Sequence, residues 1–306
     1  MAAGRGGRGG LRARPGAAVS SRAPSSRPRH AQPQNWDELA TWWRATFTNG
    51  ADVEYDQQIL PLAVAHLAGC RRILDLGCGE GQLARRLAEG AGTAEAADAA
   101  QGADCAGAEG ADVAQLAGVA GGSCSFRAAE LVVGLDPFRR QLENAASQGG
   151  GAMFVQGAGE QLPFPARAFD GVVCCLVIEH VADPDQVLAE VARVLAPGGR
   201  FLLLVNHPVI QGPGSGFVDD RLLEERYWRI GPYLPETVTV EEVDPGVRVS
   251  FAHRPLSRYV NPLTERGLVL TRLEEPAPPL EFLTGSIDLE LEAAMPRLCL
   301  MRFERH

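Results

Sequence analysis

Short apolar runs alternate with amphipathic stretches between residues 73 and 205. Five of the runs have the length of buried strands, and they cover residues 73–76, 131–136, 152–156, 169–178 and 201–205. Apolar residues at helical spacing follow three of these runs, over residues 82–88, 138–146 and 184–195. Strands that alternate with helices predict an α/β fold, here a doubly wound, mostly parallel sheet with helices on both faces.

The helix after the fourth strand has signals at both ends. Asp183 is predicted as its N-cap and Pro184 as its first residue, and Gln186 completes a capping box. The run Pro197-Gly198-Gly199 is predicted to stop this helix before the fifth strand begins.

Two further helices are predicted before the first strand, over residues 36–43 and 56–67. In the first of them Leu39, Trp42 and Trp43 share one side. This side either packs on the core or forms a flap over a substrate cleft, and the pattern favours neither alternative.

The regular alternation ends after residue 205. Residues 206–252 are interrupted by Gly and Pro and carry scattered aromatic residues, so we expect a substrate lid there. A helix near residues 256–266 contains Pro262, which predicts a kink or a late start. Two strands, near residues 268–272 and 297–303, are predicted to pair as an antiparallel hairpin at the sheet edge.

Two segments have the composition of disordered chain. Residues 1–34 hold seven Arg and no acidic residue, whereas the formal net charge of the whole chain is −9. Such an Arg- and Ser-rich extension is compatible with a transit peptide but lacks an apolar face, so a non-functional extension or an incorrect start remains open. Residues 91–129, rich in Ala, Gly and Asp, predict a flexible insertion in a domain that covers residues 35–306.

Composition excludes several kinds of chemistry. The chain has no Lys, which rules out a Schiff-base lysine, a P-loop lysine and a kinase ATP lysine. The seven Cys have no spacing for a metal site, so no metal is predicted and a reducing, cytoplasmic location is favoured. No apolar run approaches the roughly 20 residues of a membrane helix. The acidic folded part argues against nucleic acid as a partner.

The turn after the first strand is the strongest chemical signal. Gly77, Gly79 and Gly81 lack Cβ atoms and would let the backbone approach a ligand closely. A dinucleotide-binding loop needs a glycine one position later, where Gln82 stands. The loop therefore predicts a nucleotide-like ligand without a pyrophosphate.

Three more strand ends carry informative residues, and ligands bind such sheets at the carboxyl ends of the strands. Asp136 ends the second strand, where it would bind the hydroxyl groups of a ribose or, alternatively, cap the next helix. Gly159 and Glu160 follow the third strand, and the pair Glu179-His180 follows the fourth.

With these motifs in order, residues 70–208 resemble the class I S-adenosylmethionine (SAM)-dependent methyltransferases, in particular the small-molecule group that includes ubiquinone and menaquinone biosynthesis enzymes. The matching motifs are Asp75-Leu76-Gly77-Cys78-Gly79-Glu80-Gly81, Gly134-Leu135-Asp136-Pro137, Glu160-Gln161-Leu162-Pro163-Phe164, Phe169-Asp170, Ile178-Glu179-His180-Val181 and Val194-Leu195-Ala196-Pro197-Gly198-Gly199. The resemblance implies a seven-stranded, Rossmann-like sheet with an antiparallel last strand.

The resemblance also implies a set of cofactor contacts. Its residues are Asp75, Gly77, Cys78, Gly79 and Gly81 for the methionine part, Asp136 for the ribose, Pro137, Phe138, Ala158, Gly159 and Glu160 around the adenine, and Cys175 or Leu176 for the methionine ammonium. At the position of Ala158 the family often has an Asp that accepts from the adenine amino group, so this contact is absent or supplied otherwise.

Three histidines are candidate bases for methyl transfer, because poor nucleophiles need a proton acceptor. His207, just past the fifth strand, is the first choice, followed by His180 and then His253, and a structural role is the alternative for His207 and His180. Among the aromatic residues, Tyr55, Tyr227, Trp228 and Tyr233 would line the pocket or pack in the lid. The pair Asp219-Asp220 has no partner ligands at metal-binding spacing.

The sequence therefore predicts a SAM-dependent methyltransferase with a small-molecule acceptor. A SAM-binding regulatory protein without activity is the alternative, and an NAD(P)-dependent oxidoreductase is a weaker one because of Gln82. Neither the acceptor atom nor the oligomeric state can be read from the chain.

Overall fold

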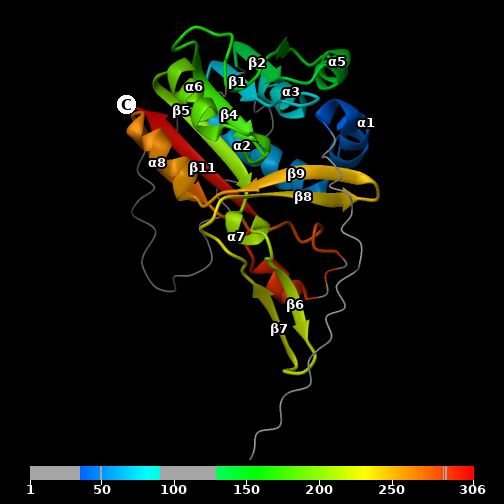
Figure 1. The fold of residues 1–306 in the computed structure, drawn as a ribbon. Coiled ribbons are helices and arrows are strands. Elements are labelled where there is room, and N and C mark those ends of the chain that lie inside the picture. Colours follow the sequence, from blue (N-terminus) through cyan, green and yellow to red (C-terminus); the bar gives the residue numbers. More distant parts are fainter. Residues whose placement is uncertain (1–34, 49, 90–128, 285, 287) are drawn as a thin grey trace, which may run out of the picture. The chain divides into compact units, whose positions relative to one another are not determined.

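A computed structural model describes residues 35–48, 50–89, 129–284, 286 and 288–306 (Figure 1). Contacts within the chain divide it into two units, residues 1–32 and residues 33–306, and the elements named below belong to the second unit. The extension over residues 1–34 and nearly all of the predicted insertion over residues 91–129 lie outside the described residues.

A seven-stranded sheet forms the centre of the fold. Its spatial order is β10-β11-β5-β4-β1-β2-β3. The strands are β1 (Arg72–Leu76), β2 (Leu131–Asp136), β3 (Met153–Gln156), β4 (Phe169–Cys175), β5 (Leu195–Asn206), β10 (Leu268–Glu274) and β11 (Leu298–Arg305). Strands β1 to β5 pair in parallel, whereas β11 is antiparallel to both β5 and β10. The mixed sheet with antiparallel pairing at its edge confirms the predicted fold class.

Helices cover both faces of this sheet because neighbouring strand residues point to opposite sides. Leu74 belongs to the apolar cluster under α6 (Pro184–Val194) and α8 (Ser257–Glu265). Its neighbour Ile73 belongs to a second cluster, under α2 (Leu60–Leu67) and α3 (Gln82–Glu89). Both residues are buried, so β1 lies between two cores as the doubly wound prediction requires.

Several predicted boundaries need correction. The fourth strand ends at Cys175, because the following residue, Leu176, has a φ of 54°, and the chain then forms the 3₁₀ turn η4 (Ile178–His180). Helix α6 has the predicted cap, since the Asp183 side chain accepts from the Gln186 N–H. The Pro-Gly-Gly run does not stop it: Leu195 is already extended and begins β5, so residues 197–199 lie inside that strand.

The other predicted helices are present with altered ends. The predicted helix over residues 56–67 is a π-helical turn, η1 (Tyr55–Ile59), that continues into α2. Pro262 lies inside α8, which begins at Ser257 and so has no late start. Helices α1 (Trp36–Phe47) and α5 (Arg139–Ser147) complete this set, and none of the helices in the described ranges is long and apolar enough to cross a membrane.

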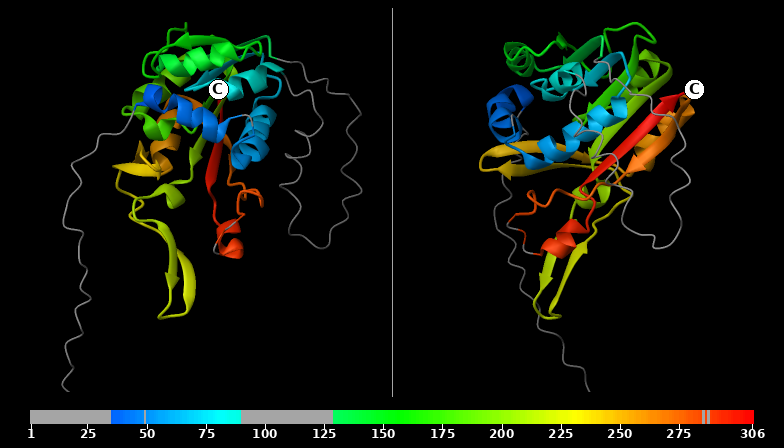
Figure 2. Two further views of the ribbon diagram at one scale, coloured as in Figure 1. Left: turned by 90° about the vertical axis from the view of Figure 1, so that its right-hand side faces the viewer. Right: turned by 180° about the vertical axis from the view of Figure 1, so that it is seen from behind.

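The predicted lid region contains regular structure. After α7 (Pro208–Gln211) it forms two hairpins, β6 (Gly216–Asp220) with β7 (Glu225–Arg229) and β8 (Thr237–Asp244) with β9 (Val247–His253). The β6–β7 hairpin projects away from the central sheet (Figure 2). The β8–β9 hairpin reaches α1, where Trp42 Nε1 donates to Asp244 Oδ2 at 2.9 Å. The short helix α9 (Leu289–Ala293) precedes β11.

Candidate functional site

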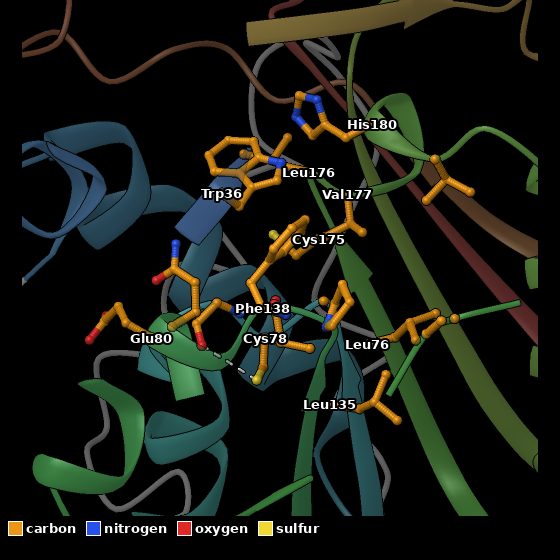
Figure 3. A pocket seen from close by; sticks show the side chains of 18 of the residues that line it. Trp36, Leu76, Cys78, Glu80, Leu135, Phe138, Cys175, Leu176, Val177 and His180 are labelled. Carbon is orange, nitrogen blue, oxygen red and sulfur yellow. Dashed lines mark hydrogen bonds between the residues drawn. The ribbon is translucent and has the colours of Figure 1, made fainter. Parts of the chain in front are cut away.

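A cavity of ≈ 420 Å³ opens at the carboxyl ends of β1, β2 and β4 (Figure 3). This is the size of a small-molecule site. The predicted site residues that line it are Gly77, Cys78, Gly79, Asp136, Pro137, Phe138, Ala158, Gly159, Glu160, Cys175, Leu176 and His180. The remaining four predicted residues, Asp75, Gly81, His207 and His253, do not line it.

The glycine loop takes a backbone path that requires glycine. Gly77, Gly79 and Gly81 all have φ between 52° and 79°. A Cβ atom on Gly77 would lie 2.5 Å from the side chain of Val177, and one on Gly81 would lie 2.5 Å from the ring of Phe154. Gly77 and Gly81 are therefore needed for packing below the loop, whereas Gly79 faces more open space.

Asp136 connects the end of β2 to the glycine loop. Its Oδ2 accepts from the Gly79 N–H at 3.0 Å and its Oδ1 from the Phe138 N–H at 2.9 Å. Burial raises the pKa of this carboxyl to about 6, against the lowering effect of the two N–H groups. A carboxylate has about four acceptor positions, so acceptor capacity remains for the two hydroxyl groups of a ribose.

Asp75 lies under the loop. It is buried, its Oδ2 has no hydrogen-bond partner, and burial raises its pKa to about 7. An indirect role, through the loop that it supports, agrees better with this position than the direct contact that the resemblance implies.

The end of β4 forms the floor of the cavity. Leu176 has a left-handed φ of 54°, which is costly for a residue with a side chain, and its N–H donates to the Leu204 carbonyl at 2.9 Å. Cys175 and Val177 flank it and also line the cavity. Strained backbone of this kind is common at ligand sites.

An aromatic wall faces the glycine loop. It consists of Trp36, Trp43 and Phe47 from α1 and Tyr55 from η1. Trp43 stacks on Phe47 with ring centroids 4.4 Å apart and meets Trp36 edge-on at 5.5 Å. The spacing of seven and then four residues along α1 puts these three rings on one helix face. Of the side predicted from the sequence, Trp43 lines the cavity, whereas Leu39 is buried and Trp42 contacts the β8–β9 hairpin, so the helix both packs on its neighbours and covers the cavity.

Of the three candidate bases, His180 alone lines the cavity. Its Nδ1 lies 2.8 Å from the carbonyl oxygen of Ser250, and its ring lies between Trp36 and Phe251, with centroid distances of 5.1 and 4.9 Å. Because a carbonyl oxygen only accepts, Nδ1 carries the hydrogen and the neutral ring has its lone pair on Nε2.

The two other histidines make structural contacts. His207 is buried, caps α7 through its Nδ1 and places Nε2 2.7 Å from Glu275 Oε1. His253 is also buried, with Nε2 2.7 Å from the carbonyl of Tyr233. Of the four aromatic candidates, Tyr55 lines the cavity and the three lid residues do not.

Sequence reasoning missed two amide side chains in the cavity. Gln82 and Gln141 both line it, and each has a buried Oε1 without a hydrogen-bond partner. Gln82 stands directly after Gly81, where a dinucleotide-binding loop needs a glycine, and the sequence prediction used it only as an argument against a dinucleotide ligand. Gln141 lies three residues after Phe138 in α5, and no motif marks it.

These residues fit SAM. The ammonium, ribose and adenine amino groups of SAM are hydrogen-bond donors, and the cavity presents unpaired acceptors on Gln82 and Gln141 and the spare capacity of Asp136. The bare backbone of Gly79 leaves room for close approach. Among the residues that the structure describes, no group of His, Cys, Asp or Glu could hold a metal ion.

Comparison with known proteins agrees with this geometry. A family model described as "Methyltransferase domain" matches residues 112–203. The demethylmenaquinone methyltransferase of Thermus thermophilus is 31% identical over 163 residues, which are 53% of this chain and 59% of that protein. The ubiquinone/menaquinone biosynthesis C-methyltransferase UbiE of Psychromonas ingrahamii is 40% identical over 70 residues, 23% of this chain and 28% of that protein. The chain thus matches less than two thirds of the length of these relatives.

Solved structures show the same fold. A SAM-dependent methyltransferase from Mesorhizobium loti superposes with a TM-score of 0.58 at 24% identity, over 83% of this chain and 99% of that chain. A putative SAM-dependent methyltransferase from Listeria monocytogenes gives 0.57 at 20% identity, over 83% and 100%. Together, the family model, the curated relatives and the shared fold support a class I SAM-dependent methyltransferase.

Proposed function

We propose that this protein transfers a methyl group from SAM to a small, uncharged acceptor. The observation that carries the proposal is the bond from the Gly79 N–H to Asp136, which joins the glycine loop in one cavity to the acid that is predicted to bind the ribose. SAM, when bound, supplies an electrophilic methyl group on its sulfonium.

In the cofactor half of the cavity, SAM would be bound by residues of β1 and β2 and of the turns after them. Asp136 accepts from the ribose hydroxyls, Phe138 and Pro137 pack on the adenine, and Gly159 donates its N–H to the adenine edge. Gln82 and Gln141 offer acceptors that the sequence prediction did not include.

The acceptor half has an apolar, aromatic wall. None of the described lining residues is an arginine, and the chain has no lysine, so a carboxylate or phosphate on the acceptor would find no cationic partner. Trp36, Trp43 and Phe47 instead offer ring surface and exclude water. An uncharged molecule with one ionisable O–H or N–H suits this half best.

His180 replaces His207 as the proposed base. Its Nε2 lone pair belongs to a residue that lines the cavity, whereas His207 Nε2 is engaged with Glu275. His180 would take the proton that the acceptor loses. The lid residues 206–252 do not line the cavity, so they would act on the reaction through His180, which β9 contacts directly.

Isothermal titration with S-adenosylhomocysteine tests the proposal. We expect saturable binding, and the absence of binding at millimolar ligand would refute it. Asp136→Ala should weaken binding by about 1.5–3 kcal/mol, because hydrogen bonds to a charged group are lost.

A second assay separates the alternatives. Transfer of a radiolabelled methyl group to metabolites of a cell extract is expected, whereas binding without labelled product would favour a regulatory SAM-binding protein. The comparisons favour neither that protein nor an oxidoreductase, and the latter would show itself by dinucleotide binding. We also propose a cytoplasmic location, with no nucleic-acid partner, in line with the acidic composition.

A further inference from the structure

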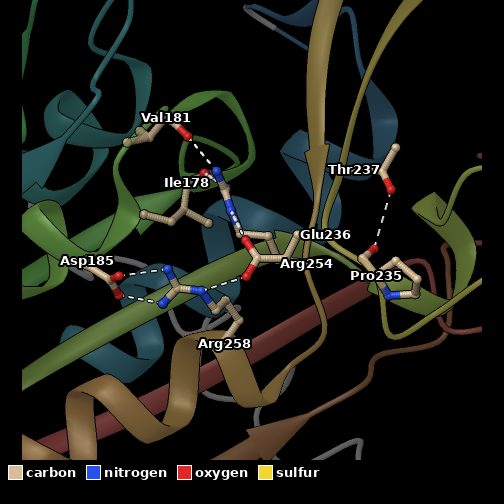
Figure 4. A network of polar contacts seen from close by, with 8 residues as sticks. All are labelled: Ile178, Val181, Asp185, Pro235, Glu236, Thr237, Arg254 and Arg258. Carbon is tan, nitrogen blue, oxygen red and sulfur yellow. Dashed lines mark hydrogen bonds and ion pairs between the residues drawn. The ribbon is translucent and has the colours of Figure 1, made fainter.

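The end of strand β9 holds the turn that carries His180 at several points. The Ser250 carbonyl accepts from His180 Nδ1, and the Phe251 ring packs on the imidazole. Three residues further on, Arg254 Nη1 donates to the Ile178 carbonyl at 2.8 Å and Nη2 donates to the Val181 carbonyl at 2.7 Å (Figure 4). One guanidinium thus binds the backbone on both sides of His180.

Arg254 is itself fixed from the lid side. It is 5% exposed, and its Nε lies 3.5 Å from Glu236 Oε2. Glu236 Oε1 accepts from Arg258 at 2.8 Å, and Arg258 donates in turn to Asp185 Oδ2 at 2.7 Å. Figure 4 shows this chain of alternating charges, which joins the base of the β8–β9 hairpin to α6 and η4. A planar fork suits two carbonyl groups of one turn, and the point charge of a lysine does not.

We propose that Arg254 is a positioning residue that fixes the direction in which His180 presents Nε2 to the cavity. Glu236 makes this direction depend on the placement of the lid. The role of Nε2 as proton acceptor rests on the proposed function, but the positioning of the ring does not. When Nε2 takes the proton of an acceptor O–H or N–H, the resulting imidazolium keeps its Nδ1–H bond to Ser250.

The test compares Arg254→Gln and Arg254→Lys with the matched control Arg258→Gln. Arg258 belongs to the same chain of charges, but its hydrogen bonds go to Glu236 and Asp185 and to no atom of η4. Nitrogen chemical shifts of ¹⁵N-labelled histidine at pH 8 report which ring nitrogen of His180 carries the hydrogen. Titration with S-adenosylhomocysteine and the urea midpoint are measured on the same samples.

We expect His180 of the wild type and of Arg258→Gln to be in the Nδ1–H form. Arg254→Gln should show a mixture of both forms, and Arg254→Lys an intermediate result. Methyl transfer to the extract should fall in Arg254→Gln at least in proportion to the lost Nδ1–H form and at most about a hundredfold, the effect of a lost general base, with S-adenosylhomocysteine affinity changed by less than about threefold.

A wild-type tautomer in Arg254→Gln would overturn the inference, and so would an equal change of tautomer in Arg258→Gln. If Arg254→Gln does not fold, Arg254→Lys decides between the same two outcomes, because it retains the charge. A wild type that does not bind S-adenosylhomocysteine refutes the proposed function, while the tautomer comparison still decides the positioning of His180.

Discussion

Asp136→Asn should separate cofactor affinity from stability. The side chain keeps its size, but one of its two oxygens becomes an amide nitrogen. Both oxygens of Asp136 accept from backbone N–H groups, so the variant loses one of these two bonds. The backbone N–H that has lost its acceptor then faces the N–H₂ group of the asparagine. This loss alone should cost about 1–3 kcal/mol of the free energy of unfolding.

The removal of the charge acts in the opposite direction. The pKa of Asp136 rises from 3.8 to about 6 on folding, because burial disfavours the carboxylate. A raised pKa on an acid means that the wild type loses stability as pH rises from the unfolded to the folded value, between about 4 and 6. The loss is about 2–3 kcal/mol at pH 7, since each pKa unit corresponds to 1.36 kcal/mol. The asparagine variant has no such loss.

Urea unfolding of both proteins at pH 4 and pH 7 measures the difference. Relative to the wild type, Asp136→Asn should gain about 2–3 kcal/mol between the two pH values. In this comparison the pH-independent cost of the lost hydrogen bond cancels. The variant should also bind S-adenosylhomocysteine more weakly at pH 7. An equal stability difference at both pH values, or unchanged affinity, would refute the reasoning.

Three further predictions concern packing, the histidines and the lid. Gly81→Ala should lower the free energy of unfolding by about 1–3 kcal/mol, because its Cβ would meet Phe154 at 2.5 Å. Gly198→Ala is the control, because Gly198 also has a positive φ but faces open space. Equal losses of stability of the two variants in urea unfolding would contradict the packing argument. His207→Gln should lower the melting temperature and leave S-adenosylhomocysteine affinity within about threefold, since the residue caps α7 outside the cavity; a large loss of affinity would restore it as a site residue. Trp42→Phe removes the indole N–H that binds the β8–β9 hairpin and should raise amide exchange in that hairpin, whereas unchanged exchange would show that the bond does not hold the lid.

The sheet and the edge at which the cavity opens could be predicted because their signals are local. Asp136 and Gly79 each stand at the end of a short apolar strand, and parallel strands bring such ends to one edge. Their hydrogen bond follows from that topology, although 57 positions separate the two residues in the chain.

The choice among histidines depended on longer-range information. His207 follows β5 at the expected edge, but Glu275 engages its Nε2, and no pattern in the sequence links these two residues. His180 gains its fixed tautomer from Ser250, in a hairpin that the sequence prediction for residues 206–252 did not include. Strands β7 and β8 expose most of their side chains, whereas β9 alternates apolar and polar residues at Val247, Val249 and Phe251, a strand signal that the sequence prediction did not use.

The cavity has a thermodynamic consequence for the whole fold. Its lining comes from two stretches of chain, residues 36–82 and residues 135–187, which are connected through residues 83–134. A ligand that binds only when both stretches are in place adds its binding free energy to their association. S-adenosylhomocysteine should therefore suppress opening across the β1–β2 and β1–β4 pairs together, and so act as a non-covalent cross-link between two parts of the chain rather than as a local support for the glycine loop.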